Sequence, residues 1–253
     1  MLLAIDIGNS NIVIGVCRAG DIERHWRINT GRDRTADEYG LVLRGLLESA
    51  GAGKIEGAII CSVVPALDGV FREALEGWCG VTPLFVGESN VKAGIRIAID
   101  NPAEAGADRI ANAVEAYGRF KSSVIVVDFG TATTFDYVTG EGEYAGGVIA
   151  PGIGISAEAL FQKTSKLPRM DMARPDRAIG KNTADAMRSG LFWGFSGLVD
   201  GVIERMTAEA GTSTAIIATG GLARVIAGGS RYIKETDEFL TLKGLIKIYE
   251  GNS

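Results

Sequence analysis

The sequence predicts an α/β protein built from two related halves. The main observation is an internal repeat: residues 2–16 read LLAIDIGNSNIVIGV and residues 124–138 read VIVVDFGTATTFDYV. Each stretch is an apolar run, an Asp-x-Gly with small polar residues, and a second β-rich run. Strand-like and helix-like stretches also follow one another along the chain, which is typical of layered α/β folds. We therefore expect two hairpins whose tips carry Asp6 and Asp128, facing each other across a central cleft.

The first half is expected to span residues 1–118. Gly8-Asn9 marks the turn of its hairpin, Pro65 stops a buried strand, and Thr35 with Glu38 has the spacing of a capping box. Ile/Val-rich runs and helical apolar spacing predict the remaining elements. These are strands near 2–7, 11–17, 22–29 and 57–64, short strands within 83–99, and helices over 35–50, 66–78 and 105–119.

The second half is expected to span residues 119–253. Its predicted strands lie near 123–128, 132–138, 143–150 and 214–221, and its helices follow Pro151-Gly152, cover 183–210 and 222–227, and close the chain at 239–249. Gly194 or Gly197 is expected to break the long helix, because glycine is a poor helix former. Residues 163–182 are polar and carry two prolines, Pro168 and Pro175, so we expect a loop there.

Composition narrows the class of protein. The chain has 253 residues, 46% of them hydrophobic and 23% charged, with a net charge of −5, which is typical of a globular protein. It shows no basic block, no apolar run long enough to span a membrane and no signal-peptide pattern, so neither nucleic acid nor a membrane is an expected partner. Three unpatterned cysteines and one histidine, His25, favour a cytoplasmic protein without a zinc site.

The repeated hairpin tip is the strongest candidate site. Gly8 permits a tight turn whose backbone N–H groups can bind phosphate oxygens, and Asn9, Ser10 and Asn11 add side-chain donors. Asp6 would act on phosphate through Mg²⁺, which binds carboxylates, phosphates and water. A single such motif also fits an ordinary β-hairpin, whereas its repetition favours phosphate binding. The chain has no GxxxxGK[ST] loop and no complete GxGxxG motif, so dinucleotide binding is weakly supported.

A glycine pair is the third candidate element. Gly220 and Gly221 follow a buried strand and would leave bare backbone against which adenine or ribose could lie. The alternative is a helix-opening turn capped by Thr219, and the two interpretations are compatible.

Together these motifs resemble the acetate/sugar kinase, Hsp70 and actin superfamily, and within it the type III pantothenate kinases. The motifs are DIGNSN (6–11), SVVP (62–65), DNPAEAGADR (100–109), DFGTATTFD (128–136), GGVIAPG (146–152), GKNT (180–183), TGG (219–221) and DEFLTLKGL (237–245). The resemblance implies two duplicated ribonuclease H-like (actin-like ATPase) domains with a central cleft. It also implies ATP-dependent phosphorylation of pantothenate to 4′-phosphopantothenate, the first step of coenzyme A biosynthesis, by a homodimer with its site near the subunit interface.

The resemblance also implies the role of each matching residue. Asp108 corresponds to the catalytic base. Gly106, Ala107 and Arg109, together with Asp108 and Thr183, correspond to pantothenate contacts. Asp128 corresponds to the ligand of a monovalent cation, K⁺ or NH₄⁺, while Asp6 would hold Mg²⁺ directly or through water. The implied ATP contacts are Asp6, Ile7, Gly8, Asn9, Ser10, Asn11, Ile12, Val13, Thr131, Gly220 and Gly221.

The chain departs from the family pattern at one position, and two alternative functions remain. Ile99 stands where the family commonly has a tyrosine that helps to cover the substrate, so one hydroxyl contact is missing. The chain could instead be a kinase of the same superfamily acting on another small hydroxyl substrate, or a nucleotide-binding regulator without kinase activity. Arg32, Arg34, Lys54 and the charges in 231–238 are expected to be solvated.

Overall fold

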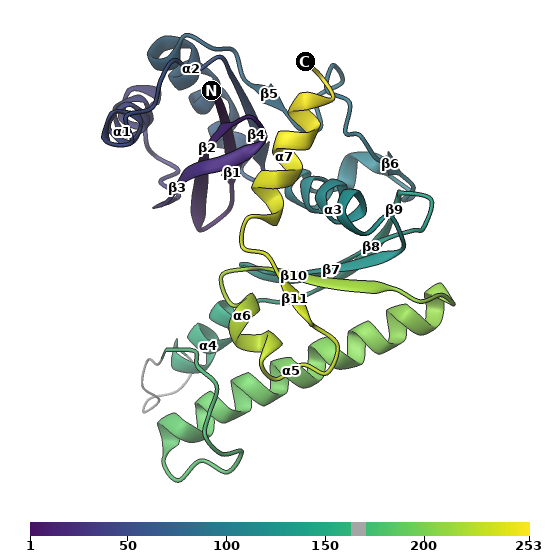
Figure 1. The fold of residues 1–253 in the computed structure, drawn as a ribbon. Coiled ribbons are helices and arrows are strands. Elements are labelled where there is room, and N and C mark those ends of the chain that lie inside the picture. Colours follow the sequence, from purple (N-terminus) through teal and green to yellow (C-terminus); the bar gives the residue numbers. More distant parts are fainter. Residues whose placement is uncertain (163–170) are drawn as a thin grey trace. The chain divides into compact units, whose positions relative to one another are not determined.

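The computed structural model describes residues 1–162 and 171–253 and divides them into two compact units (Figure 1). Unit 1 comprises Met1–Glu115 together with Phe239–Ser253, and unit 2 comprises Ala116–Glu238. The expected division into 1–118 and 119–253 is therefore wrong for the C-terminal segment. The loop expected at 163–182 lies partly outside the described residues. No helix in the described ranges is long and apolar enough to cross a membrane.

Unit 1 contains a five-stranded sheet in the order β3-β2-β1-β4-β5. The strands are β1 (Leu2–Ile7), β2 (Asn11–Arg18), β3 (Asp21–Asn29), β4 (Gly57–Ser62) and β5 (Leu84–Phe85). The first three form an antiparallel meander, and β4 runs parallel to β1. β1 and β4 are covered on both faces and are almost wholly apolar, whereas the edge strand β3 alternates polar and apolar residues.

Helices cover both faces of this sheet. Leu3 and Ile5 of β1 pack into one cluster with Tyr39 of α1 (Ala36–Ser49) and Phe71 of α2 (Asp68–Cys79). The intervening Ala4 belongs to a second cluster with residues of α3 (Ala107–Phe120) and α7 (Leu240–Glu250). The smaller elements are the 3₁₀ turns Pro65–Leu67 and Pro102–Glu104 and the short strand β6 (Arg96–Ile97). The predicted capping box of α1 is confirmed, with Thr35 and Glu38 each bonded to the other's backbone.

The helix α7 was expected to close the second half and instead lies against β1 and β4 in unit 1 (Figure 1). The Thr241 hydroxyl donates to Oδ1 of Asn112 at 2.8 Å, and Lys247 forms an ion pair with the buried Glu115 at 2.8 Å. Leu242 and Leu245 of α7 are buried in the cluster around Ala4. This helix therefore completes the core of the first unit.

Gly244 of α7 should not tolerate a side chain. A Cβ at this position would overlap the backbone carbonyl of Ala111 in α3. We expect Gly244→Ala to lower the free energy of unfolding by about 1–3 kcal/mol in urea titrations. Gly45→Ala is the matched control, because Gly45 lies in α1 with open space around it, and alanine there should stabilise the helix by about 0.5–1 kcal/mol. Equal stability of Gly244→Ala and wild type would contradict this packing.

The sheet of unit 2 repeats the arrangement of unit 1. It contains β7 (Val124–Phe129), β8 (Ala132–Val138), β9 (Glu143–Pro151), β10 (Ala215–Gly220) and β11 (Glu235–Thr236). Antiparallel β7, β8 and β9 correspond to β1, β2 and β3, and β10 runs parallel to β7 as β4 does to β1. The duplication predicted from the repeated motif is therefore confirmed in the strand order.

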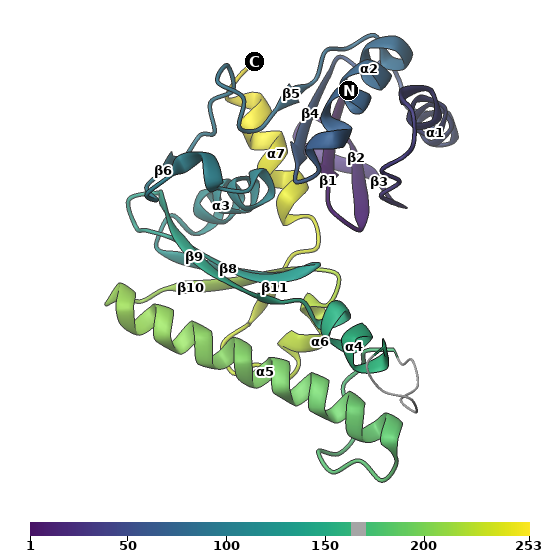
Figure 2. The same cartoon turned by 180° about the vertical axis from the view of Figure 1, so that it is seen from behind.

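The long helix α5 (Thr183–Ala210) is continuous (Figure 2). The break expected near Gly194 or Gly197 is wrong. A Cβ added to either glycine would have no neighbour within 4 Å, while Phe192, Val199 and Ile203 of the same helix are buried in the core of unit 2. This packing outweighs a helix-propensity cost of about 1 kcal/mol per glycine. The remaining helices of unit 2 are α4 (Ile153–Gln162) and α6 (Ala223–Ala227).

Candidate functional site

Both hairpin tips are closed by a backbone hydrogen bond from their glycine, and the second turn is one residue shorter than the first. In unit 1 the backbone N–H of Gly8 donates to the carbonyl oxygen of Asn11 at 3.0 Å, and in unit 2 that of Gly130 donates to Ala132 at 3.0 Å. A Cβ on Gly8 would approach the Asn11 oxygen to 2.9 Å. Glycine thus allows the chain to close tightly at this tip, as the motif predicted.

Asp6 is the carboxylate of the first tip. It lies near the end of β1 in register with Cys61 of β4, and the buried Cys61 thiol donates to Oδ1 of Asp6 at 3.3 Å. Burial, with a smaller contribution from the charge of Asp108, raises the pKa of Asp6 to about 7, against the opposing effects of Cys61 and Arg27. Two carboxylates in one poorly hydrated region therefore repel each other, which is an arrangement that a bound cation would relieve.

Asp108 lies in the first turn of α3, within the Gly-Ala-Asp-Arg motif. Its Oδ1 accepts a hydrogen bond from the backbone N–H of Arg109 at 2.8 Å. Burial raises the pKa of Asp108, although that hydrogen bond and the Arg109 charge oppose the shift. A Cβ on Gly106 would approach Oδ1 of Asp108 to 2.7 Å, so glycine leaves space for this carboxylate. Asp6 and Asp108, far apart in sequence, are thus brought together in unit 1.

In unit 2 the structure brings Asp128 and the glycine pair together. Asp128 near the end of β7 pairs in register with Thr219, and Phe129 pairs with Gly220. A Cβ on Gly220 would approach Oδ1 of Asp128 to 2.6 Å, and the φ of Gly220 is +90°, which disfavours any other residue. Thr131 lies at the hairpin tip, and Thr183 is the exposed first residue of α5, after the cap Asn182.

The structure also shows contacts that the sequence did not predict. Cys61 stands in an apolar run of the sequence, which indicates a small buried hydrophobe; it is buried, but its thiol also contacts Asp6. Arg32 is exposed as expected, yet its Nη2 donates to Oδ1 of Asn9 at 2.8 Å. Both contacts depend on which strands pair and in what register, so they could have been found only by aligning β1 with β4 and β2 with β3.

The described residues contain no group of three or more His, Cys, Asp or Glu side chains arranged to hold a metal ion. A divalent ion at Asp6 would therefore take most of its ligands from phosphate groups and water. This is the usual coordination of Mg²⁺ in phosphoryl-transfer sites.

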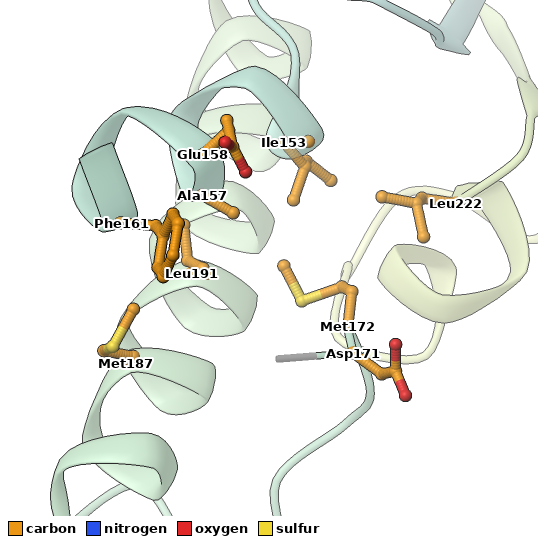
Figure 3. Close-up of a pocket in the computed structure, with 10 residues that line it drawn as sticks. Ile153, Ala157, Glu158, Phe161, Asp171, Met172, Met187, Leu191 and Leu222 are labelled. Carbon is orange, nitrogen blue, oxygen red and sulfur yellow. The ribbon is translucent and has the colours of Figure 1, made fainter. Parts of the chain in front are cut away.

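A separate apolar cavity of about 500 Å³ lies within unit 2 (Figure 3). Ile153 and Phe161 of α4, Met187 and Leu191 of α5, and Leu222 line it, together with the carboxylate of Glu158. Leu222 directly follows the glycine pair, whereas the predicted site residues are not among those lining the cavity.

Comparison with solved structures shows the fold. A Campylobacter jejuni protein assigned to a Baf family of transcriptional activators has a TM-score of 0.62 and 22% identity, with 99% of this chain and 98% of that chain covered. Component A of (R)-2-hydroxyglutaryl-CoA dehydratase from Acidaminococcus fermentans has a TM-score of 0.57 and 14% identity over 98% and 96% of the two chains. The fold is that of the actin-like ATPases and sugar kinases, as the sequence predicted.

Comparison of sequences shows the family. The profile of the type III pantothenate kinases matches residues 2–205. A protein of Pelobacter propionicus named type III pantothenate kinase is 54% identical over 254 residues, covering 100% of both chains. One of the same name from Geobacter sulfurreducens is 51% identical, with 100% of this chain and 99% of the relative covered. The chain belongs to the type III pantothenate kinase family.

Proposed function

We propose that this protein transfers the γ-phosphoryl group of ATP to the hydroxyl of pantothenate, giving 4′-phosphopantothenate at the first step of coenzyme A biosynthesis. The family supports the substrates. The observation that carries the chemistry is that Asp6 lies near enough to Asp108 in unit 1 for the Asp108 charge to raise its pKa, while burial raises the pKa of both carboxyl groups. Phosphoryl transfer needs a cation beside the phosphates and a base beside the attacking hydroxyl, and these two carboxylates suit the two tasks.

Asp108 is the base in this proposal. Burial raises the pKa of Asp108, which strengthens its affinity for the hydroxyl proton. A positioned base contributes about 10²–10⁴ to the rate. The neighbouring Arg109 binds the pantothenate carboxylate, for which a guanidinium fork is well suited. Gly106, Ala107 and Thr183 provide further contacts to pantothenate.

ATP binding is assigned to the hairpin tips and the glycine pair. Residues 6–13 supply backbone amides and side-chain donors to the phosphates, and Thr131, Gly220 and Gly221 contact the nucleotide. Asp6 holds Mg²⁺, which neutralises phosphate charge when bound. Asp128 holds K⁺ or NH₄⁺. A Cβ on Gly220 would lie 2.6 Å from Oδ1 of Asp128, so the glycine leaves space beside this carboxylate for such an ion.

The proposal includes a cytoplasmic homodimer. Unit 2 exposes several large apolar side chains on neighbouring elements, among them Ile149 of β9, Ile155 and Leu160 of α4, and Trp193 of α5. Ile149 is 65% exposed, and large exposed apolar side chains of this kind are suited to contact with another chain. The net charge of −5 disfavours nucleic acid as a partner, whereas small anionic substrates can still bind at local sites.

The test is a coupled ADP-release assay with pantothenate, ATP and Mg²⁺, in K⁺ and in Na⁺. We expect ADP release that depends on pantothenate and is faster in K⁺, with 4′-phosphopantothenate identified by mass spectrometry. The Asp108→Asn protein, purified in parallel, controls for a contaminating ATPase. ATP binding without pantothenate-dependent turnover in either salt would overturn the proposal and favour another acceptor or a regulatory role.

A further inference from the structure

We propose that Arg32 is a phosphate-binding residue for ATP, which it contacts through its guanidinium at the tip of the β1–β2 hairpin. This inference rests on the proposed function, because it places the phosphates of ATP at that tip. The motifs that identified the candidate site do not include Arg32, which lies in the connection between β3 and α1.

The connection that carries Arg32 is fixed to the hairpin tip. The backbone N–H of Thr30 donates to the carbonyl oxygen of Ser10 at 3.1 Å, and the Thr30 hydroxyl donates to the carbonyl oxygen of Gly8 at 2.7 Å. These bonds hold the backbone next to the glycine turn proposed to bind phosphate.

The other side of the connection is fixed to the core of unit 1. The hydroxyl of Tyr39 accepts a hydrogen bond from the N–H of Gly31 at 3.0 Å and donates to the Gly31 carbonyl at 2.9 Å. Tyr39 is 0% exposed and packs against Phe71. Arg32 therefore follows a backbone segment held from both sides, which limits the backbone entropy lost when a ligand binds there.

The side chain of Arg32 already lies at the tip. Its Nη2 donates to Oδ1 of Asn9 at 2.8 Å, and Asn9 is itself one of the proposed ATP contacts. This bond engages one of the five N–H donors of a guanidinium. The group is exposed, so an incoming phosphate can meet it without a conformational change of the core.

The hairpin tip itself supplies no positively charged side chain to bind the phosphates. Residues 2–17 contain no lysine or arginine, and their one carboxylic acid is Asp6. The triphosphate of ATP carries about four negative charges, of which Mg²⁺ neutralises two, and phosphoryl-transfer sites usually add a lysine or an arginine. Arg27 on β3 acts on the Asp6 carboxylate, whose pKa it lowers, whereas Arg32 contacts Asn9 at the turn.

Arg34 provides a matched control within the same connection. Its guanidinium lies over the Tyr39 ring, 5.7 Å from the centroid, and its aliphatic stem lies against Gly31. It thus shares the exposure and charge of Arg32 but contacts the anchoring tyrosine instead of the hairpin tip. If the positive charges only attracted ATP over a long range, Arg32→Gln and Arg34→Gln would weaken ATP binding equally.

The experiment compares Arg32→Gln, Arg32→Lys and Arg34→Gln with wild type. Equilibrium binding of Mg²⁺–ATP is measured by calorimetry, and KM is measured for ATP and for pantothenate. We expect Arg32→Gln to weaken ATP binding about 10-fold or more, since a hydrogen bond to a charged group is lost. The KM for pantothenate should change less than about twofold, Arg32→Lys should recover part of the affinity, and Arg34→Gln should stay within about threefold of wild type.

Three outcomes would overturn the inference. The first is ATP binding by Arg32→Gln within about twofold of wild type, and the second is an equal loss of ATP affinity in Arg34→Gln. The third is a loss of ATP affinity in Arg32→Gln that comes with a lower melting temperature, neither of which Arg32→Lys restores. The binding measurement does not require turnover. Wild type that binds ATP without phosphorylating pantothenate would thus refute the proposed function alone, whereas wild type that binds no ATP would refute both.

Discussion

Asp108→Asn is expected to abolish pantothenate-dependent turnover while leaving ATP affinity within about twofold of wild type. The amide has nearly the shape of the carboxylate, and its oxygen can still accept the hydrogen bond that the Arg109 N–H donates at 2.8 Å. It cannot accept the proton of the attacking hydroxyl. Loss of a general base lowers kcat by about 10²–10⁴, which would place the variant at or below the detection limit of a coupled assay.

The measurement is kcat together with the dissociation constant of Mg²⁺–ATP. Glu104→Gln is the control, because Glu104 is an exposed acid four residues earlier that accepts a hydrogen bond from the Asn101 amide, which glutamine can also do. Its kcat should equal that of wild type. A kcat of Asp108→Asn within about threefold of wild type would remove Asp108 as the base.

The features predicted correctly from sequence are those with local signals. The two hairpins follow from short apolar runs on either side of a glycine turn. The repeat of this pattern predicted two related halves, and the structure shows the corresponding strands in the same order in both. The capping box at Thr35 likewise depends on residues three apart. Such signals are independent of the rest of the chain, so a single sequence is enough to read them.

The features missed depend on contacts between distant segments. The helix α7 follows unit 2 in the chain but packs on β1 and β4, where its leucines join the apolar cluster that contains Ala4. Glycine propensity predicted a break in α5, and burial of Phe192 and Val199 prevents one. The Cys61–Asp6 and Arg32–Asn9 bonds follow from strand register, which the sequence alone did not provide.

The candidate site was predictable in its parts and less so in its electrostatics. The motifs singled out Asp6 and Asp108 separately, and only the fold brings them into one partly buried region, where the charge of Asp108 disfavours that of Asp6. Their roles as ion ligand and base remain predictions. The raised pKa of Asp6 nevertheless has a consequence for stability that can be measured without any substrate.

Asp6→Asn is expected to stabilise the metal-free protein above pH 7 although it removes turnover. Because the pKa of Asp6 is raised from 3.8 to about 7, the folded state binds its proton more tightly than the unfolded state. The carboxylate therefore costs nothing below pH 3.8, costs progressively more as the pH rises, and has its full effect above pH 7. A shift of about three pKa units corresponds to at most about 4 kcal/mol, and the neutral amide avoids this cost.

Urea unfolding in EDTA at pH 5 and pH 8 measures the effect. The stability advantage of Asp6→Asn over wild type should be about 2–4 kcal/mol at pH 8 and should shrink clearly at pH 5. Asp21→Asn, at an exposed position of the same unit, should show no such dependence. An advantage of equal size at both pH values would show that the carboxylate is not held uncharged by burial.

Adding Mg²⁺ with ATP at pH 8 should stabilise wild type more than the variant, because the bound cation then compensates for the carboxylate charge that destabilises the ligand-free protein. The Asp6 carboxylate would thus lower the stability of the ligand-free fold and also provide the group that binds the cation.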